Sequence, residues 1–313
     1  MKTELSEMQQ ALLTTFKSFV AYCEENGITY YAAYGTLIGA VRHHGFIPWD
    51  DDIDVYMKRV DYDRFVANRE KLLNSTYRIC DVLDGDSPYP FAKFYSTQGT
   101  IWEYRHFPFI LGPWIDVFPL DEGTKGDSDA KKIFDRLYYH MWKYRKALSY
   151  VTWKEIGQDV VCGNIINAAI NVVKKLRYAP WKQSYLKEIA QDINIVRSVQ
   201  GDMLQGYFGG VENEFFQKSW FDGADICPFE DTTITIPKGY HDCLTFWYGD
   251  YMKLPPENQR KGTHEGFFTN LQKRMTRDEI LNSCKEKGTS SSKMSIKVII
   301  DEIKHRKGFV LKE

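Results

Sequence analysis

The aspartates at positions 50–54 are the residues of this chain with the clearest capacity for chemistry. Four carboxylates fall within these five positions. Asp52 and Asp54 alternate with Ile53 and Val55, and this period of two predicts a short strand with one apolar face. Two carboxylates held side by side on a strand raise each other's pKa unless a cation lies between them. The pattern therefore predicts that Asp52 and Asp54 hold a hard divalent ion with oxygen ligands, Mg²⁺ or Mn²⁺.

A phosphate site is expected just upstream of these carboxylates. Gly35 and Thr36 follow a predicted strand over residues 28–34 and open a short predicted helix over residues 37–43. A strand that passes through glycine into a helix leaves backbone N–H groups free for a phosphate. A phosphate site followed by metal-binding carboxylates is the layout of a phosphoryl-transfer or nucleotidyl-transfer enzyme.

An acidic run can equally be a solvated loop or a helix cap, and most isolated runs of aspartate are of that kind. Two features favour a site here. The Gly-Thr pair precedes the run, and β-branched apolar residues are interleaved with the aspartates.

The stretch from Gly35 to Val55 closely resembles the signature of the LicD family, a branch of the nucleotidyltransferase superfamily that includes phosphocholine transferases. The superfamily pattern is a Gly-Ser-like turn followed by a strand bearing Asp-hydrophobic-Asp, and Asp52 to Asp54 fit it. Thr36 stands where serine is common, so the hydroxyl is kept. The resemblance implies that Asp52 and Asp54 are catalytic as well as metal-binding.

Asp116 is the third candidate carboxylate. It lies between Ile115 and Val117 in a predicted short strand. The residues alone leave two readings open, a hydrogen-bonded structural aspartate or a third metal ligand. The resemblance favours the third ligand, because an Ile-Asp-hydrophobic-Phe-Pro-Leu-Asp stretch recurs in the family. Asp121 is expected to cap the following helix or turn.

Basic groups that could meet phosphate oxygens are expected in three places. Arg42 follows the Gly-Thr turn, and Lys93 lies in a predicted strand where it could equally be a surface charge. Residues 247–264 resemble the second LicD signature, Tyr-Gly-Asp-Tyr with Pro-Pro and a following Arg and His. Such loops are usually exposed and inert, but the resemblance implies that Arg260 and His264 face the phosphates of the donor.

The function implied by the resemblance is transfer of a phospho-alcohol group, with phosphocholine from CDP-choline favoured. The acceptor would be a sugar hydroxyl of a cell-surface glycan or a lipid-linked sugar, as in lipopolysaccharide or teichoic acid. A nucleotidyltransferase that passes NMP from an NTP to a sugar or protein hydroxyl would use the same carboxylates. The remaining alternative is an inactive glycan-binding module.

The composition is that of an ordinary globular protein, with 27% charged residues and a formal net charge of −1. Without a basic excess, a nucleic-acid partner is not expected. The six cysteines are scattered and include no CxxC pair, which indicates reduced thiols in the cytoplasm. Neither a signal peptide nor a transmembrane segment is predicted.

The pattern of elements predicts an α/β fold of the α+β type, a mixed-sheet nucleotidyltransferase-like core with a helical elaboration. The expected core covers residues 1–125. A mainly helical region is expected over residues 126–313, with its 247–264 segment folded back onto the active site. Basic residues in the 174–182 cluster indicate either a solvated helix end or a surface that meets anionic lipid headgroups at the inner face of the membrane. The periodicity predicts helices over residues 4–26, 60–73, 131–148, 155–176, 181–199 and 240–248, and strands over 77–83, 91–95, 100–104 and 232–237.

Overall fold

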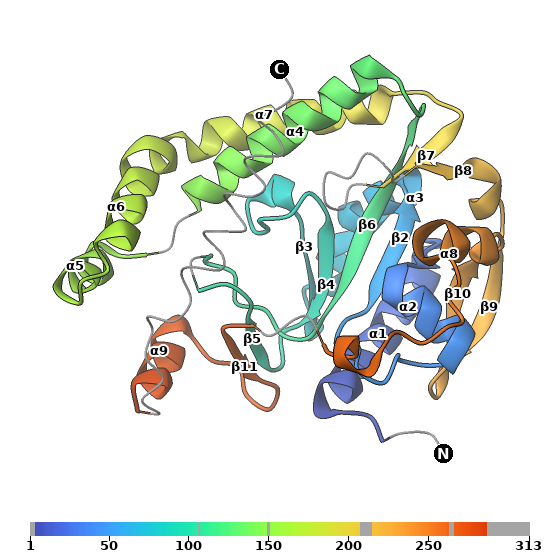
Figure 1. Cartoon of the computed structure of the whole chain (residues 1–313), viewed down its shortest axis with the longest axis horizontal. Helices are drawn as coiled ribbons and strands as arrows, with labels where there is room; N and C mark the ends of the chain where they lie inside the picture. Colours follow the sequence, from blue (N-terminus) through green and yellow to red (C-terminus); the bar gives the residue numbers. More distant parts are fainter. Residues whose placement is uncertain (1–3, 106, 149–150, 207–214, 263–265, 287–313) are drawn as a thin grey trace. The chain divides into compact units, whose positions relative to one another are not determined.

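The computed structural model describes residues 4–105, 107–148, 151–206, 215–262 and 266–286 (Figure 1). The chain divides into two compact units. The first comprises Met1–Tyr150 and Lys174–Arg274, and the second Val151–Val173 and Met275–Glu313. The boundary expected between residues 125 and 126 stays a prediction, and helices from beyond it belong to the first unit.

A mixed sheet forms the centre of the first unit, with the strand order β1-β2-β6-β4-β3. β2 and β6 are parallel and the other neighbours in this order are antiparallel, so the predicted α/β fold class is confirmed. β7 continues the sheet from the end of β6, and β8 pairs with β7. The strands are β1 (Tyr31–Ala32), β2 (Asp54–Lys58), β3 (Tyr77–Cys80), β4 (Ala92–Ser96), β6 (Trp114–Gly123), β7 (Met203–Gln205) and β8 (Phe215–Gln217).

Helices α1 (Glu7–Glu25) and α3 (Arg59–Ala67) cover one face of this sheet. α1 begins with a capping box at Ser6, as its predicted amphipathic pattern requires. The ring of Phe94 on β4 lies 5.6 Å from Phe19 of α1 and 6.5 Å from Phe65 of α3. The face with α1 and α3 is therefore an aromatic core closed to solvent.

The opposite face carries α2 (Tyr34–Ile38), its π-helical continuation (Gly39–His43) and α8 (Tyr240–Tyr248). Tyr34 packs against Tyr56 of β2, Phe118 of β6 and Trp247 of α8, with ring centroids 5.2 to 5.5 Å apart. Because side chains alternate along a strand, the even-numbered residues of β2 and β6 point to this face.

Helices α4 (Ser128–Ala147) and α7 (Lys182–Ser198) form a second apolar core in the first unit. Leu137, Tyr144 and Ile189 are almost fully buried in it. Two two-stranded sheets complete this unit, β9 (Ala224–Phe229) with β10 (Thr232–Pro237) and β5 (Thr100–Trp102) with β11 (Phe268–Asn270).

The second unit contains α5 (Trp153–Val161), α6 (Ile165–Val173) and α9 (Arg277–Glu286). Thr152 and Glu155 form a capping box at the start of α5. Arg277 Nη2 of α9 donates to both carboxylate oxygens of Glu155 at 2.8 Å, so α5 and α9 are joined by a charge-assisted pair.

Some predicted elements differ from the structure. Of the strand expected over residues 28–34, only the two residues of β1 pair with a neighbouring strand, which is β2. The helix expected over 155–176 is broken into α5 and α6 by Gly163, whose φ of +79° lies outside the helical region. The strands expected over 91–95 and 100–104 follow each other in the chain but do not pair, because β4 pairs with β3 and β6 while β5 pairs with β11.

Asp121 does not cap a helix. It is buried at the far end of β6, where Arg59 donates to both of its carboxylate oxygens at 2.8 and 2.6 Å. The helix expected over 60–73 is α3 followed by a 3₁₀ turn over 68–72, and the residue at its N-cap is Lys58.

Candidate active site

The carboxylates of Asp54 and Asp116 belong to the same face of the sheet. β2 and β6 run parallel with Asp54 opposite Asp116, and the N–H of Asp116 donates to the carbonyl of Ile53 at 2.9 Å. Residues opposite each other on neighbouring strands point to the same side. Ile53 and Ile115, one position away, are fully buried against the other face. The alternation seen in the sequence therefore places two carboxylates from strands far apart in the chain side by side.

Asp54 lies in a strongly negative environment. Burial raises the pKa of its carboxyl well above the ordinary value, and the charges of Asp52, Asp116 and Asp50 raise it further. The charge of Lys93 acts in the opposite direction and is smaller than these. Such crowding of carboxylates costs free energy that a bound cation would offset.

Lys93 is the cation that the structure brings to Asp116. Its Nζ lies 2.6 Å from Asp116 Oδ1, and Trp114 Nε1 donates to Asp116 Oδ2 at 3.1 Å. Lys93 is buried, so its reading as a surface charge is wrong. Burial lowers the pKa of Lys93, but the charges of Asp116 and Glu103 outweigh this effect, so the pKa lies above its ordinary value.

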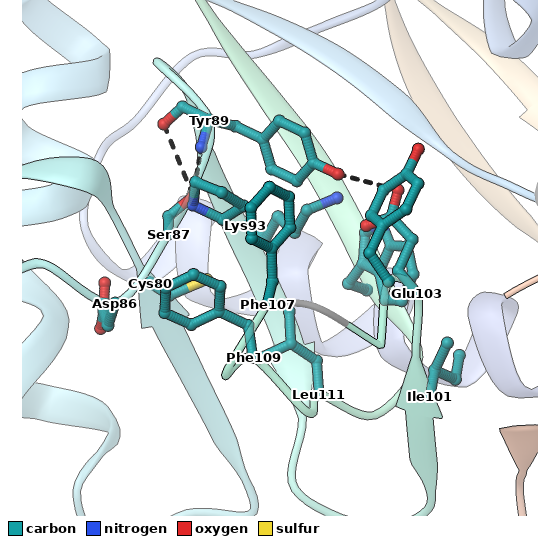
Figure 2. A pocket seen from close by; sticks show the side chains of 13 residues that line it. Cys80, Asp86, Ser87, Tyr89, Lys93, Ile101, Glu103, Phe107, Phe109 and Leu111 are labelled. Atoms are coloured by element: carbon teal, nitrogen blue, oxygen red, sulfur yellow. Dashed lines mark hydrogen bonds between the residues drawn. The ribbon is translucent and has the colours of Figure 1, made fainter. Parts of the chain in front are cut away.

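A pocket lined with aromatic rings adjoins this ion pair. Lys93 Nζ lies 4.3 Å from the ring centroid of Trp114 and 4.9 Å from that of Tyr89. The Tyr89 hydroxyl donates to Glu103 Oε1 at 2.9 Å, and Figure 2 shows this bond with Lys93 beside the Tyr89 ring. Phe107, from a neighbouring loop, also lines the pocket. The sequence did not predict that Glu103 and Trp114 belong to this site, because only the fold brings them close to Lys93.

The Gly35-Thr36 turn lies against the aspartates. The hydroxyl of Thr36 accepts a hydrogen bond of 2.9 Å from the N–H of Asp54, which ties the start of α2 to the start of β2. A Cβ atom on Gly35 would lie only 2.8 Å from Asp50 Oδ2. A larger residue at position 35 would therefore displace the Asp50 carboxylate from the turn. The phosphate site expected at this turn stays a prediction.

Asp52 lies just before β2 and not on it, beside Asp50 and Asp51. One carboxylate oxygen from each of these three residues falls within 4.8 Å of the others. Of the three predicted metal ligands, Asp54 and Asp116 are thus opposite each other on neighbouring strands. Asp52 instead lies close to Asp50 and Asp51. Asp50 and Asp51 belong to the same acidic run, but the alternation in the sequence did not predict them as metal ligands.

Residues 247–262 lie against this acidic cluster. A Cβ on Gly262 would lie 2.7 Å from Asp51 Oδ2. Burial raises the pKa of the Tyr248 hydroxyl, and the charges of Asp54, Asp50 and Asp52 raise it further.

Of the predicted basic residues, Arg260 and Arg42 lie in or against this same segment. The guanidinium of Arg260 lies 5.6 Å from the ring centroid of Trp49, and its Nε donates to the carbonyl of Pro255 at 2.9 Å. Arg42 Nη1 donates to the carbonyl of Tyr251 at 2.6 Å, so it joins the π-helix to this segment. His264 lies outside the described residues. Phosphate binding by these three side chains stays a prediction.

Comparison with known proteins identifies the family. Residues 27–143 match the LicD/FKTN/FKRP nucleotidyltransferase domain. The chain is 33% identical over 268 residues to the lipopolysaccharide cholinephosphotransferase LicD of Haemophilus influenzae, an alignment that covers 84% of this chain and 97% of that protein.

Shorter matches join it to uncharacterized proteins of two Rickettsia species. The identity is 42% over 55 residues for Rickettsia typhi, covering 18% of each chain. It is 51% over 37 residues for Rickettsia prowazekii, covering 12% of this chain and 14% of the other. Because the alignment with the Haemophilus influenzae protein covers 84% of this chain and 97% of that protein, this chain belongs to the LicD family.

Proposed function

We propose that this protein transfers phosphocholine from CDP-choline to a sugar hydroxyl of lipopolysaccharide or of a lipid-linked precursor. The observation that carries the proposal is the in-register pairing of Asp54 with Asp116 on one sheet face. The alignment with the Haemophilus influenzae protein, named as a lipopolysaccharide cholinephosphotransferase, supports the choice of alcohol and acceptor. The six cysteines are free thiols, which suits a reducing cytoplasm.

A divalent cation fits the carboxylate face. Asp54 is repelled by three other aspartates, and the oxygens of Asp50, Asp51 and Asp52 already lie within 4.8 Å of one another. Carboxylate oxygens are the ligands that Mg²⁺ and Mn²⁺ prefer. Asp52, Asp54 and Asp116 would hold the ion. When bound, it would neutralise the diphosphate and offset charge on the attacking and leaving oxygens.

In the proposed reaction, the acceptor oxygen attacks the phosphorus atom that bears choline. A new P–O bond forms, the P–O bond to CMP breaks, and CMP leaves with the electron pair. The hydroxyl proton passes to one of the site carboxylates. Lys93, held beside Asp116, supplies a positive charge for the phosphate oxygens. Arg42, Arg260, His264 and the Gly35-Thr36 turn are proposed to bind the rest of the diphosphate.

A nucleotidyltransferase is the second candidate. It is supported by the match of this chain to a family described as a nucleotidyltransferase domain. The same carboxylates would then act on an NTP, with pyrophosphate as the leaving group. An inactive binding module is disfavoured, since it has no use for clustered carboxylates that destabilise the fold in the absence of a cation.

The test is a donor screen with the purified full-length protein and Mg²⁺ or Mn²⁺. CDP-choline, CDP-glycerol, CDP-ribitol and the four NTPs are each supplied with a sugar acceptor, and CMP and pyrophosphate are measured. We expect metal-dependent CMP release with CDP-choline above the other donors. CMP release mainly from another CDP-alcohol would overturn the choice of choline, and pyrophosphate release from an NTP would establish the second candidate.

A further inference from the structure

The turn between α5 and α6 exposes large apolar side chains in the second unit. Val161 and Ile166 are 88% and 75% exposed, and Val160 and Ile165 are also more than half exposed. No residue between Val160 and Val173 carries a charge. Contiguous exposed apolar surface of this kind marks a site of association with another molecule.

The buried sides of α5 and α6 already have packing partners. Ile156 of α5 and Ala168 of α6 are buried, and the Asn167 side-chain amide donates to Asp159 at 2.8 Å across the turn. The hairpin is thus a formed element. The apolar side chains at its tip remain exposed although the two helices have packed against each other.

The chain on either side of this tip is basic. Residues 151–182 contain five lysines and arginines against two acidic residues. Both acidic side chains have partners, Glu155 with Arg277 and Asp159 with Asn167. Two exposed tryptophans, Trp153 and Trp181, begin and nearly end the same stretch. Apolar residues with flanking tryptophan and basic residues are the pattern of segments that rest in the headgroup region of a bilayer.

We propose that the α5–α6 tip inserts into the surface of a membrane that contains anionic lipids. Lys154 belongs to the same unit as the tip, and Lys174, Lys175 and Arg177 follow α6 directly in the chain. Among the described residues no helix is long and apolar enough to cross a bilayer, so the tip rests on the membrane and does not span it. A second copy of the chain is a poorer occupant. Each partner in a stable protein interface buries about 800 Å², and the four exposed apolar side chains of the tip are few for such an area. The inference is independent of the proposed reaction.

The test is vesicle flotation of the full-length protein, with vesicles of phosphatidylcholine alone or mixed with phosphatidylglycerol. We expect binding to the anionic vesicles that weakens as salt rises. The variant V161D/I166D should reduce this binding at least about tenfold, because two apolar side chains no longer insert. V60D/I226D is the matched control, since Val60 and Ile226 are exposed apolar residues of the first unit, 70% and 65% exposed.

Cys162, exposed at the tip, provides a second readout. An environment-sensitive fluorophore attached there should shift to shorter wavelength with anionic vesicles and not with phosphatidylcholine alone. Equal binding by V161D/I166D and its control, or equal binding to both vesicle types, would overturn the proposal. Self-association that V161D/I166D abolishes, without vesicle binding by the parent protein, would assign the tip to a second copy and overturn it too.

Discussion

Asp54 illustrates how one residue links the fold to the chemistry. Its N–H is fixed by Thr36, its strand position is set by pairing with β6, and its carboxyl is crowded by three other aspartates. Ile53 and Val55 on either side anchor the strand in the core. The packing residues and the reacting residues therefore alternate, and either kind can be changed without the other.

We predict that Asp54→Asn lowers CMP release at least about a hundredfold, because a metal ligand and several kcal/mol of charge stabilisation are lost. Near-normal release with excess Mn²⁺ would show that Asp54 is not a ligand.

The same variant should change how stability depends on pH. Because the pKa of Asp54 is raised in the folded state, the folded protein keeps a proton that the unfolded chain releases above about pH 4. The free energy of unfolding of the metal-free protein should therefore fall as pH rises above about 4. In Asp54→Asn this fall should be smaller and the thermal midpoint at neutral pH higher. A large drop in the midpoint would instead place Asp54 in a structural hydrogen-bond network.

Lys93 gives a second prediction at this scale. Lys93→Met leaves the buried Asp116 without its cation and should lower the free energy of unfolding by about 3–5 kcal/mol. The double variant K93M/D116N removes the unpaired charge and should recover much of that loss. Urea unfolding of the wild type, K93M, D116N and K93M/D116N measures the coupling, and additive losses would contradict it.

Among the elements, the π-helix after α2 is placed by a close approach of its backbone to the loop before the aspartates. A Cβ on Gly39 would lie 2.5 Å from the carbonyl oxygen of Gly45, whereas a Cβ on Gly157 in α5 would meet no atom within 4 Å. Gly39→Ala should therefore destabilise the protein by about 1–3 kcal/mol. Gly157→Ala should stabilise it by about 0.5–1 kcal/mol, because alanine favours the helix. Equal shifts in the urea midpoint would contradict this account.

The 247–262 segment supplies a prediction about the donor. Arg260→Lys keeps the charge but loses the planar fork that meets phosphate in two places, so the Kd for CDP-choline should rise on the order of tenfold. Lys261→Arg makes the reverse exchange at the adjacent exposed position and serves as the control. Calorimetry that finds an unchanged Kd for Arg260→Lys would remove this residue from the phosphate site.

Whether a feature of this structure could be predicted from the sequence depends on whether its partners are near or distant in the chain. Helix α1 and the strand around Asp116 follow from local periodicity, and both are confirmed. The ion pair between Lys93 and Asp116, the burial of Asp121 beside Arg59, and the pairing of β5 with β11 depend on partners distant in sequence. No local pattern encodes such partners, because they are chosen by the packing of the whole sheet.

For the whole molecule, the carboxylate face predicts stabilisation by metal. A cation that binds only the folded state at a hundredfold excess over its Kd adds about 2.7 kcal/mol, or roughly 5–10 °C in thermal midpoint for a unit of this size. Mn²⁺ should produce such a shift in the wild-type protein and a much smaller one in Asp54→Asn. A midpoint that Mn²⁺ leaves unchanged in the wild type would argue against a metal site.

The pair of Glu155 with Arg277 also bears on how this chain is made. These residues are 122 positions apart, and they belong to one compact unit interrupted by a long insertion from the other. At about 5–20 residues per second, a ribosome needs roughly 5–20 s to synthesise this insertion, residues 174–274. During that interval α5 and α6 have been synthesised but α9 has not. The apolar hairpin is thus open to chaperones, or to a nearby membrane, before the unit to which it belongs can close.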